Sequence, residues 1–256
     1  MKTAPRLSVN LNKVALLRNS RHTGVPDLLK YAALVREAGA DGITVHPRPD
    51  ERHIRRDDVL KLAEWMAPWR PKFELNVEGF PDERLMEIVR IVRPEQCTLV
   101  PDDPNVLTSE EGWKLDSRDS QIVASAVPAF QREGCRVILF IDPDPSVITS
   151  VAQTGADGIE IYTGSYAGEF RTRVRGSYFQ NTVATAHAAH ALGIRVNLGH
   201  DLNLENLPPL VAVLPPFAEA SIGHELTADA LAVGFPNAIR AYKAALGGAP
   251  LITPAL

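Results

Sequence analysis

The sequence predicts an α/β fold, a closed (β/α)8 barrel (TIM barrel) with additional helices, which occupies residues 1–256 as a single domain. Eight apolar runs of strand length alternate with amphipathic stretches along the whole chain, and eight such units fit a barrel better than an open sheet. An internal repeat supports this prediction. The residues Gly-Ala-Asp-Gly-Ile at 39–43 recur at 155–159, four units later, each time between a helix and a strand. No glycine-rich dinucleotide fingerprint or P-loop is found.

The expected elements follow from hydrophobic periodicity and from residues typical of helix ends. Many of the helical stretches begin at Asp, Ser or Pro and stop at Gly, which supplies caps for the helix termini. The segment 202–214 is interrupted by proline and gives the weakest helical pattern. The strands are expected at 7–11, 42–46, 72–77, 97–101, 137–142, 158–164, 195–200 and 218–224. The helices are expected at 27–38, 58–66, 82–92, 121–133, 144–153, 178–192 and 227–246.

Composition narrows the possible partners and the compartment. The net charge of −4 and the scattered basic residues argue against nucleic acid and an anionic membrane surface as partners. A short basic cluster at 48–56 suits a small phosphorylated ligand. Cys97 and Cys135 lie in or beside apolar runs and are expected to be buried, reduced thiols. Residues 1–6 lack the apolar stretch of a signal peptide, and no run is long enough to span a bilayer, so we expect a cytoplasmic protein.

Polar side chains gather near the predicted carboxyl ends of the strands, which is where barrel enzymes carry their active sites. Four of the seven histidines, His46, His53, His200 and His224, fall at or just after such ends. Charged and amide residues are costly inside apolar strands unless they are paired or used. The other residues at these positions are Asn10, Asn12, Arg48, Glu74, Asn76, Thr108, Asp142, Glu160, Tyr162, Asn197 and Ser221. The pattern favours acid–base chemistry at a common rim.

Two features predict phosphate binding. The residues Ser-Ile-Gly-His at 221–224 close the last strand before a helix, as in the usual phosphate site of this fold. Arg18 and Arg21, which follow the first strand, provide a second anion clamp. Two anion sites indicate two phosphorylated substrates or one bisphosphate.

Several alternative chemistries have little support. A binuclear amidohydrolase would need two alternating histidines on the first strand, where this chain has asparagines. A Schiff-base aldolase needs a lysine at the barrel mouth, and the candidate near a strand end is Lys13. What remains is catalysis by histidine and glutamate on a carbonyl compound, with no metal and no cofactor.

Short runs along nearly the whole chain resemble, in order, the pyridoxine 5′-phosphate synthase family. The most specific is Gly-Ile-Thr-Val-His at 42–46, followed by Arg-His-Ile at 52–54. The others are Val-Asn at 9–10, Leu-Arg-Asn-Ser-Arg at 17–21, Leu-Val-Pro at 99–101, Leu-Phe-Ile-Asp at 139–142, Ile-Glu-Ile at 159–161, Thr-Gly at 163–164, Val-Asn at 196–197, Gly-His at 199–200 and Ile-Gly-His at 222–224.

The resemblance implies a homo-octamer of barrels that condenses 1-deoxy-D-xylulose 5-phosphate with 3-amino-2-oxopropyl phosphate. The products are pyridoxine 5′-phosphate, inorganic phosphate and water. It further implies that His46 and Glu74 are general bases, that His200 is the proton donor or shuttle, and that a loop at 102–112 forms a lid. The implied ligands of deoxyxylulose phosphate are Arg48, His53 and Thr108, those of the aminoketone phosphate are Asn10, Arg18, Gly223 and His224, and Glu160 has a supporting role.

The chain departs from the family pattern at two places in the expected site. Asn12 and Lys13 stand where many members have Asp-His, a pair that contacts deoxyxylulose phosphate, and Asp201 stands where the family usually has glycine. These departures leave two alternatives open: a phosphosugar lyase or isomerase on the same barrel, in which Lys13 would react with substrate, and a non-catalytic homologue that only binds phosphorylated ligands.

Overall fold

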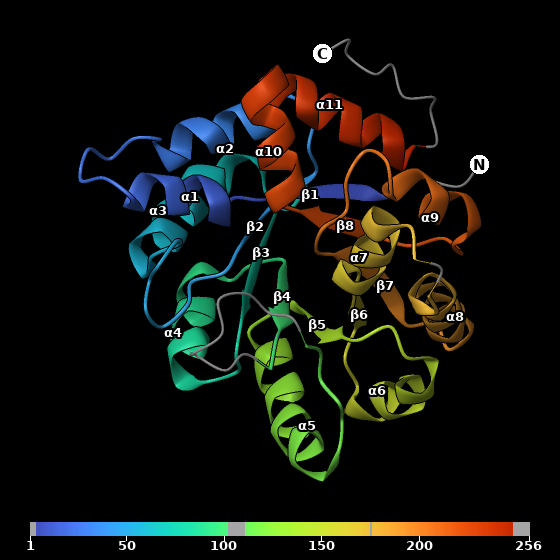
Figure 1. The fold of residues 1–256 in the computed structure, drawn as a ribbon. Coiled ribbons are helices and arrows are strands. Elements are labelled where there is room, and N and C mark those ends of the chain that lie inside the picture. The colour runs from blue at the N-terminus through green and yellow to red at the C-terminus, as the bar shows by residue number, and fades with distance from the viewer. Residues whose placement is uncertain (1–3, 102–110, 175, 248–256) are drawn as a thin grey trace.

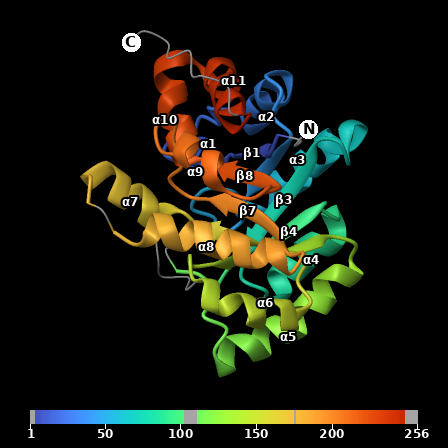
Figure 2. The ribbon, with the colours of Figure 1, turned by 90° about the vertical axis from the view of Figure 1, so that its right-hand side faces the viewer.

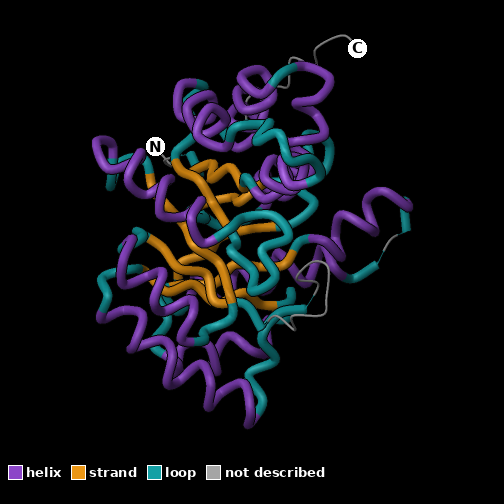
Figure 3. Tube along the Cα trace, turned by 90° about the vertical axis from the view of Figure 1, so that its left-hand side faces the viewer, coloured by secondary structure: helices purple, strands orange, loops and turns teal. Residues whose placement is uncertain are grey.

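Eight parallel strands pair in chain order, and β8 pairs with β1 to close the barrel. The computed structural model describes residues 4–101, 111–174 and 176–247. Figure 3 shows the strands at the centre with the helices around them. The strands are β1 (Arg6–Asn10), β2 (Gly42–Val45), β3 (Glu74–Gly79), β4 (Gln96–Leu99), β5 (Arg136–Ile141), β6 (Gly158–Tyr162), β7 (Arg195–Gly199) and β8 (Glu219–Ile222). The predicted fold class is confirmed, and each predicted strand overlaps an observed one.

Helices cover the outside of the barrel, with α5 and α6 on the side opposite α10 and α11 (Figures 1 and 2). The helices are α1 (Asn12–Asn19), α2 (Leu28–Glu37), α3 (Arg56–Met66), α4 (Glu83–Val92), α5 (Ser117–Arg132), α6 (Ile148–Thr154), α7 (Gly164–Thr172), α8 (Tyr178–Ala191), α9 (Leu207–Val213), α10 (His224–Val233) and α11 (Phe235–Leu246). None of these described helices is long and apolar enough to cross a membrane.

The helices differ from the prediction in three places. The stretch expected to form one helix at 227–246 is divided, because Gly234 has a φ of 82° and Pro236 opens a new helix. The helices α1 and α7 begin directly after β1 and β6, and their sequences did not reveal them. Both are short and have weakly amphipathic sequences, which explains why periodicity missed them.

The repeated Gly-Ala-Asp-Gly-Ile segment has a structural role in both copies. Gly39 and Gly155 have φ values of 93° and 74°, which glycine adopts without strain at the end of a helix. The carboxylates of Asp41 and Asp157 then each accept a hydrogen bond of 2.8 Å from the backbone N–H of a neighbouring strand, at Leu7 and Val137. In each copy the aspartate therefore ties the start of one strand to the neighbouring strand. The segment lies at the amino-terminal ends of the strands, away from the mouth of the barrel.

Strand alternation places polar side chains inside the barrel and apolar ones against the helices. On β3, Leu75 and Val77 are fully buried in the apolar layer outside the barrel, whereas Asn76 accepts a 3.1 Å hydrogen bond from Thr98 of β4. A similar contact of 2.7 Å joins the hydroxyls of Ser8 and Thr44. The lumen is consequently a hydrogen-bonded polar interior, unlike the apolar layers usual for this fold.

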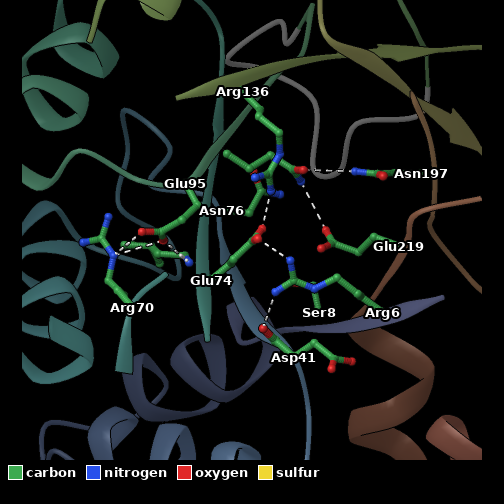
Figure 4. A network of polar contacts seen from close by, with 12 residues as sticks. Arg6, Ser8, Asp41, Arg70, Glu74, Asn76, Glu95, Arg136, Asn197 and Glu219 are labelled. Atoms are coloured by element: carbon green, nitrogen blue, oxygen red, sulfur yellow. Dashed lines mark hydrogen bonds and ion pairs between the residues drawn. The ribbon is translucent and has the colours of Figure 1, made fainter. Parts of the chain in front are cut away.

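The amino-terminal end of the barrel is closed by paired charges. The Glu74 carboxylate bridges the guanidinium groups of Arg6 and Arg136, and Figure 4 shows it between them. Close by, Gln96 donates to the buried carboxylate of Glu219 at 3.1 Å. Burial raises the pKa of Glu219, although Arg6 opposes this shift. These contacts link β1, β3, β4, β5 and β8 across this end of the barrel.

Candidate active site

A cavity of about 320 Å³ opens at the carboxyl ends of the strands. It brings together most of the residues that the sequence predicted for the site. Those that line it are Asn10, Asn12, Lys13, His46, Arg48, His53, Glu160, Tyr162, His200, Asp201, Ser221, Gly223 and His224. Residues at the ends of all eight strands, or in the loops after them, line this cavity, so the barrel itself sets their arrangement.

Glu74 does not lie at this cavity, and the prediction that it acts there is wrong. The sequence placed the third strand at 72–77, but β3 spans Glu74–Gly79, so Glu74 begins the strand at the opposite end of the barrel. Glu78 lies four residues later on the same inward face and lines the cavity. Glu78 was not predicted, because the expected strand at 72–77 ends one residue before it. Glu78 is 6% exposed, and Asn10 Nδ2 approaches its Oε2 at 3.5 Å.

Arg18 is also placed differently from the prediction, since it does not line the cavity. Its guanidinium makes a bidentate ion pair with Asp58, at 2.6 and 2.8 Å, and donates to the backbone carbonyl of His53. Both side chains of the ion pair are about nine-tenths buried. Arg18 therefore braces the loop that carries Arg48 and His53, and its charge is neutralised by Asp58. The other arginine of the predicted clamp, Arg21, is exposed.

Thr108 and most of the predicted lid at 102–112 lie outside the described residues.

His46 is held neutral at the centre of the site. It is 6% exposed, and burial, followed by the charges of Arg48 and Arg84, lowers its pKa from 6.5 to about 3. Its backbone N–H donates to the Asn12 side-chain oxygen at 2.9 Å. An asparagine oxygen accepts this hydrogen bond as a carboxylate would, so Asn12 orients the end of β2 without adding a negative charge.

His53 is a second neutral histidine, beside the first. Burial and the neighbouring His46 and Arg48 lower its pKa to about 3, and the His46 and His53 rings lie 6.1 Å apart. The backbone N–H of Ile54 donates to His53 Nδ1 at 2.9 Å. Since Nδ1 accepts a hydrogen bond, the proton lies on Nε2, which makes His53 a neutral donor suited to a phosphate oxygen.

His200 lies at the end of β7 in an unusual backbone conformation. The φ values of His200 and Asp201 are 76° and 55°, in the left-handed region that non-glycine residues seldom occupy. The Thr163 hydroxyl contacts the carbonyl of His200 at 2.6 Å and fixes this turn. The His200 ring packs against Phe140 and Tyr162, with centroids at 4.9 and 5.3 Å. The strained turn and the two rings direct the imidazole toward the cavity that it lines.

The residues at the end of β8 lie at the cavity, where the sequence predicted a phosphate site. Gly223 is the residue before α10 and His224 is its first residue, and both line the cavity. Asn10 of β1 lies against Gly223, where a Cβ would come within 3.0 Å of the Asn10 Cβ. The free N–H groups and the dipole of α10 therefore face the cavity, which favours an anion there.

A second cavity, of about 530 Å³, adjoins the first, because His46 and Arg48 line both. Its other charged residues are Arg84, Arg118, Asp82 and Asp119, none of which was predicted for the site. Arg84 lies in the first turn of α4 and donates to the carbonyl of Pro47 at 2.6 Å. The sequence contains a signal for it, because the helix expected at 82–92 places Arg84 in the first turn after the third strand. His46 and Arg48 therefore form part of the wall between the two cavities.

These observations describe a (β/α)8 barrel with a cavity of histidine, glutamate and cationic side chains at the carboxyl ends of its strands, as in barrel enzymes. The sequence model of the family described as "Pyridoxal phosphate biosynthesis protein PdxJ" matches residues 7–248. The chain belongs to this family and is an enzyme of vitamin B6 biosynthesis.

Curated relatives match over nearly their whole length. A pyridoxine 5′-phosphate synthase of Porphyromonas gingivalis is 47% identical over 93% of this chain and 97% of its own. One of Albidiferax ferrireducens is 45% identical over 93% and 95%.

Solved structures show the fold alone. Phosphoribosyl anthranilate isomerase from Thermotoga maritima has a TM-score of 0.59 at 14% identity, covering 95% of this chain and 99% of its own. Tryptophan synthase from M. tuberculosis has a TM-score of 0.63 at 14% identity, covering 98% and 94%.

Proposed function

We propose that the protein condenses 1-deoxy-D-xylulose 5-phosphate with 3-amino-2-oxopropyl phosphate to give pyridoxine 5′-phosphate, inorganic phosphate and water. The observation that carries this proposal is the convergence of His46, Glu78 and His200 on one cavity of a chain that belongs to the PdxJ family. The relatives named as synthases support the same reaction.

Proton transfer is the main chemistry that the proposed reaction requires. The amine of one substrate adds to the ketone of the other, water and phosphate leave, and protons are removed from carbon as the ring closes. A neutral imidazole can accept a proton, so His46 acts as a base once a substrate is bound. A phosphate dianion beside Arg48 offsets the cationic charges that lower the pKa of His46, which strengthens that base.

Glu78 takes the role of second base that the resemblance assigned to Glu74, and His200 returns protons to the leaving groups. Both groups line the cavity with His46, from β3 and β7 respectively. Because all three groups are in a small, largely buried space, proton transfers occur with little water present.

The two phosphates are held at opposite sides of the cavity. Arg48, His53 and Lys13 supply donors for deoxyxylulose phosphate, with the Nε2–H of His53 directed by its contact to Ile54. Asn10, Gly223 and His224 supply the site for the aminoketone phosphate at the start of α10.

The direct test is to incubate the purified protein with both phosphates and to detect pyridoxine 5′-phosphate and inorganic phosphate by chromatography. Product that requires both substrates is the expected result. Binding of both phosphates without product would remove the synthase and leave the non-catalytic homologue.

Lys13 keeps a second function open, because its side chain lines the cavity. A lyase or isomerase that uses a lysine Schiff base would be trapped by borohydride as a covalent adduct at Lys13. We expect no adduct with either phosphate, and mass spectrometry of the treated protein checks this.

We also propose a cytoplasmic homo-octamer. The free, buried Cys97 and Cys135 suit a reducing compartment, and cell fractionation tests the location. The strongly exposed apolar side chains of Leu17 on α1 and Leu231 on α10 are suited to contacts between subunits. Light scattering should then give eight times the chain mass of 27.9 kDa, whereas a monomer mass would contradict the octamer.

A further inference from the structure

Glu160 is the most completely buried acidic residue of the cavity. It projects from β6, is 1% exposed, and its Oε2 has no hydrogen-bond partner among the residues that the structure describes. Burial, with the nearby Glu78 and Glu219, raises its pKa well above the ordinary value. A buried carboxyl group without a partner is costly unless a ligand completes its contacts.

Gly199, at the end of β7, lies against this carboxyl group. The strands β6 and β7 are paired, with Glu160 opposite Asn197 and Tyr162 opposite Gly199. A Cβ built on Gly199 would overlap Glu160 Oε1 and would come within 2.8 Å of its Cδ, far inside van der Waals contact. The carboxyl group thus occupies the volume that any side chain at position 199 would fill.

The backbone itself does not require glycine at this position. The φ of Gly199 is outside the left-handed region, so an alanine could adopt the same conformation. The backbone also cannot readily move aside, because the amide and the hydroxyl of Thr163 bind the Gly199 carbonyl at 2.9 and 2.6 Å. A substitution at Gly199 would therefore remove the space that the Glu160 carboxyl group occupies.

We infer that Gly199 is a positioning residue: the missing side chain at the end of β7 lets the Glu160 carboxyl group lie in the cavity, where it hydrogen-bonds to the reacting substrates. This inference rests on the proposed function. An alanine at 199 would push the carboxyl group away by an ångström or more, and displacement of that size lowers turnover by about 10- to 100-fold. The phosphate contacts lie elsewhere in the cavity, so KM should change by less than about threefold.

The test is a double-mutant cycle of Gly199→Ala and Glu160→Ala, with product formation and urea unfolding measured for all four proteins. Gly199→Ala should lower kcat in the wild-type background and should have no further effect once Glu160 is alanine. Gly168→Ala is the matched control, since a Cβ there meets nothing within 4 Å. Its kcat should equal that of the wild type.

The inference is overturned if Gly199→Ala leaves kcat unchanged, or if its loss is the same in both backgrounds. If Gly199→Ala folds poorly, the urea unfolding data test the inference. The double variant with Glu160→Ala must then recover the free energy of unfolding that Gly199→Ala loses. If the double variant stays equally unstable, the steric contact is contradicted. An inactive wild type would instead refute the proposed function, and the unfolding measurements would still test the contact between the two residues.

Discussion

Both ends of the barrel carry buried glutamates, but the side chains that surround these glutamates differ. At the amino-terminal end, Glu74 is neutralised by Arg6 and Arg136. At the carboxyl end, Glu78 and Glu160 line an open cavity with neutral histidines. Glu74 and Glu78 are on the same face of the same strand, so their roles differ because of position and not because of residue type.

This contrast indicates how a barrel separates stability from catalysis. At the closed end Glu74 is held by ion pairs within the protein, whereas at the open end burial keeps His46 and His53 neutral. Substitutions at the two ends should consequently have separable effects on stability and turnover.

The largest expected effect is on turnover at the open end. His46→Asn should lower kcat by about 10²- to 10⁴-fold, because it removes a general base, while KM changes little. Steady-state kinetics with both phosphates measures this. Equal losses in kcat and in substrate affinity would make His46 a binding residue.

At the closed end, Glu74→Gln should lower the free energy of unfolding by about 2–3 kcal/mol, since it leaves two arginines without their counter-charge. The effect is below that of a fully buried pair because the Arg6 and Arg136 side chains are 26% and 30% exposed. Urea unfolding measures it. Unchanged stability would show that these ion pairs do not hold the closed end together.

The neutral state of His46 predicts how stability depends on pH. Its pKa is about 3 in the folded protein and 6.5 ordinarily, so the unfolded chain binds the proton more readily. The stability that His46 contributes is fully present above pH 6.5 and is lost as the pH falls toward 3, by up to about 1.4 kcal/mol per pH unit. His46→Asn should reduce this slope between pH 6.5 and 5 in urea unfolding, whereas substitution of the exposed His190 should not.

The smallest expected effect concerns Asp201, which lines the cavity where we propose that the two phosphates bind. Asp201→Asn removes a like charge from the neighbourhood of the aminoketone phosphate and keeps a residue that tolerates a φ of 55°. The KM for that substrate should fall about fivefold, on the order of 1 kcal/mol. The control is Glu205→Gln, at an exposed carboxylate that does not line the cavity. A higher KM for Asp201→Asn would show that the carboxylate contributes a favourable contact.

The sequence predicted the barrel because alternation of strands and helices is a property of the whole chain. The sequence also predicted that most of the cavity residues lie together, because His46, His200 and His224 stand at the ends of predicted strands. It failed on β3, where inward polar residues occur at Glu74, Asn76 and Glu78 and only the strand boundaries decide which one reaches the mouth. The error at Arg18 has a different cause: its partner Asp58 is 40 residues away in the sequence, and no local pattern reveals that ion pair.

The most direct test of the difference between the two ends is to measure pyridoxine 5′-phosphate formation by Glu78→Gln and Glu74→Gln side by side, normalised to folded protein. The same chemical change is made twice, four residues apart on one strand. We predict that Glu78→Gln lowers kcat by at least about 100-fold and that Glu74→Gln leaves it within about twofold of the wild type. A large loss in Glu74→Gln with a normal rate in Glu78→Gln would contradict the placement of the catalytic carboxylate at the carboxyl end of β3.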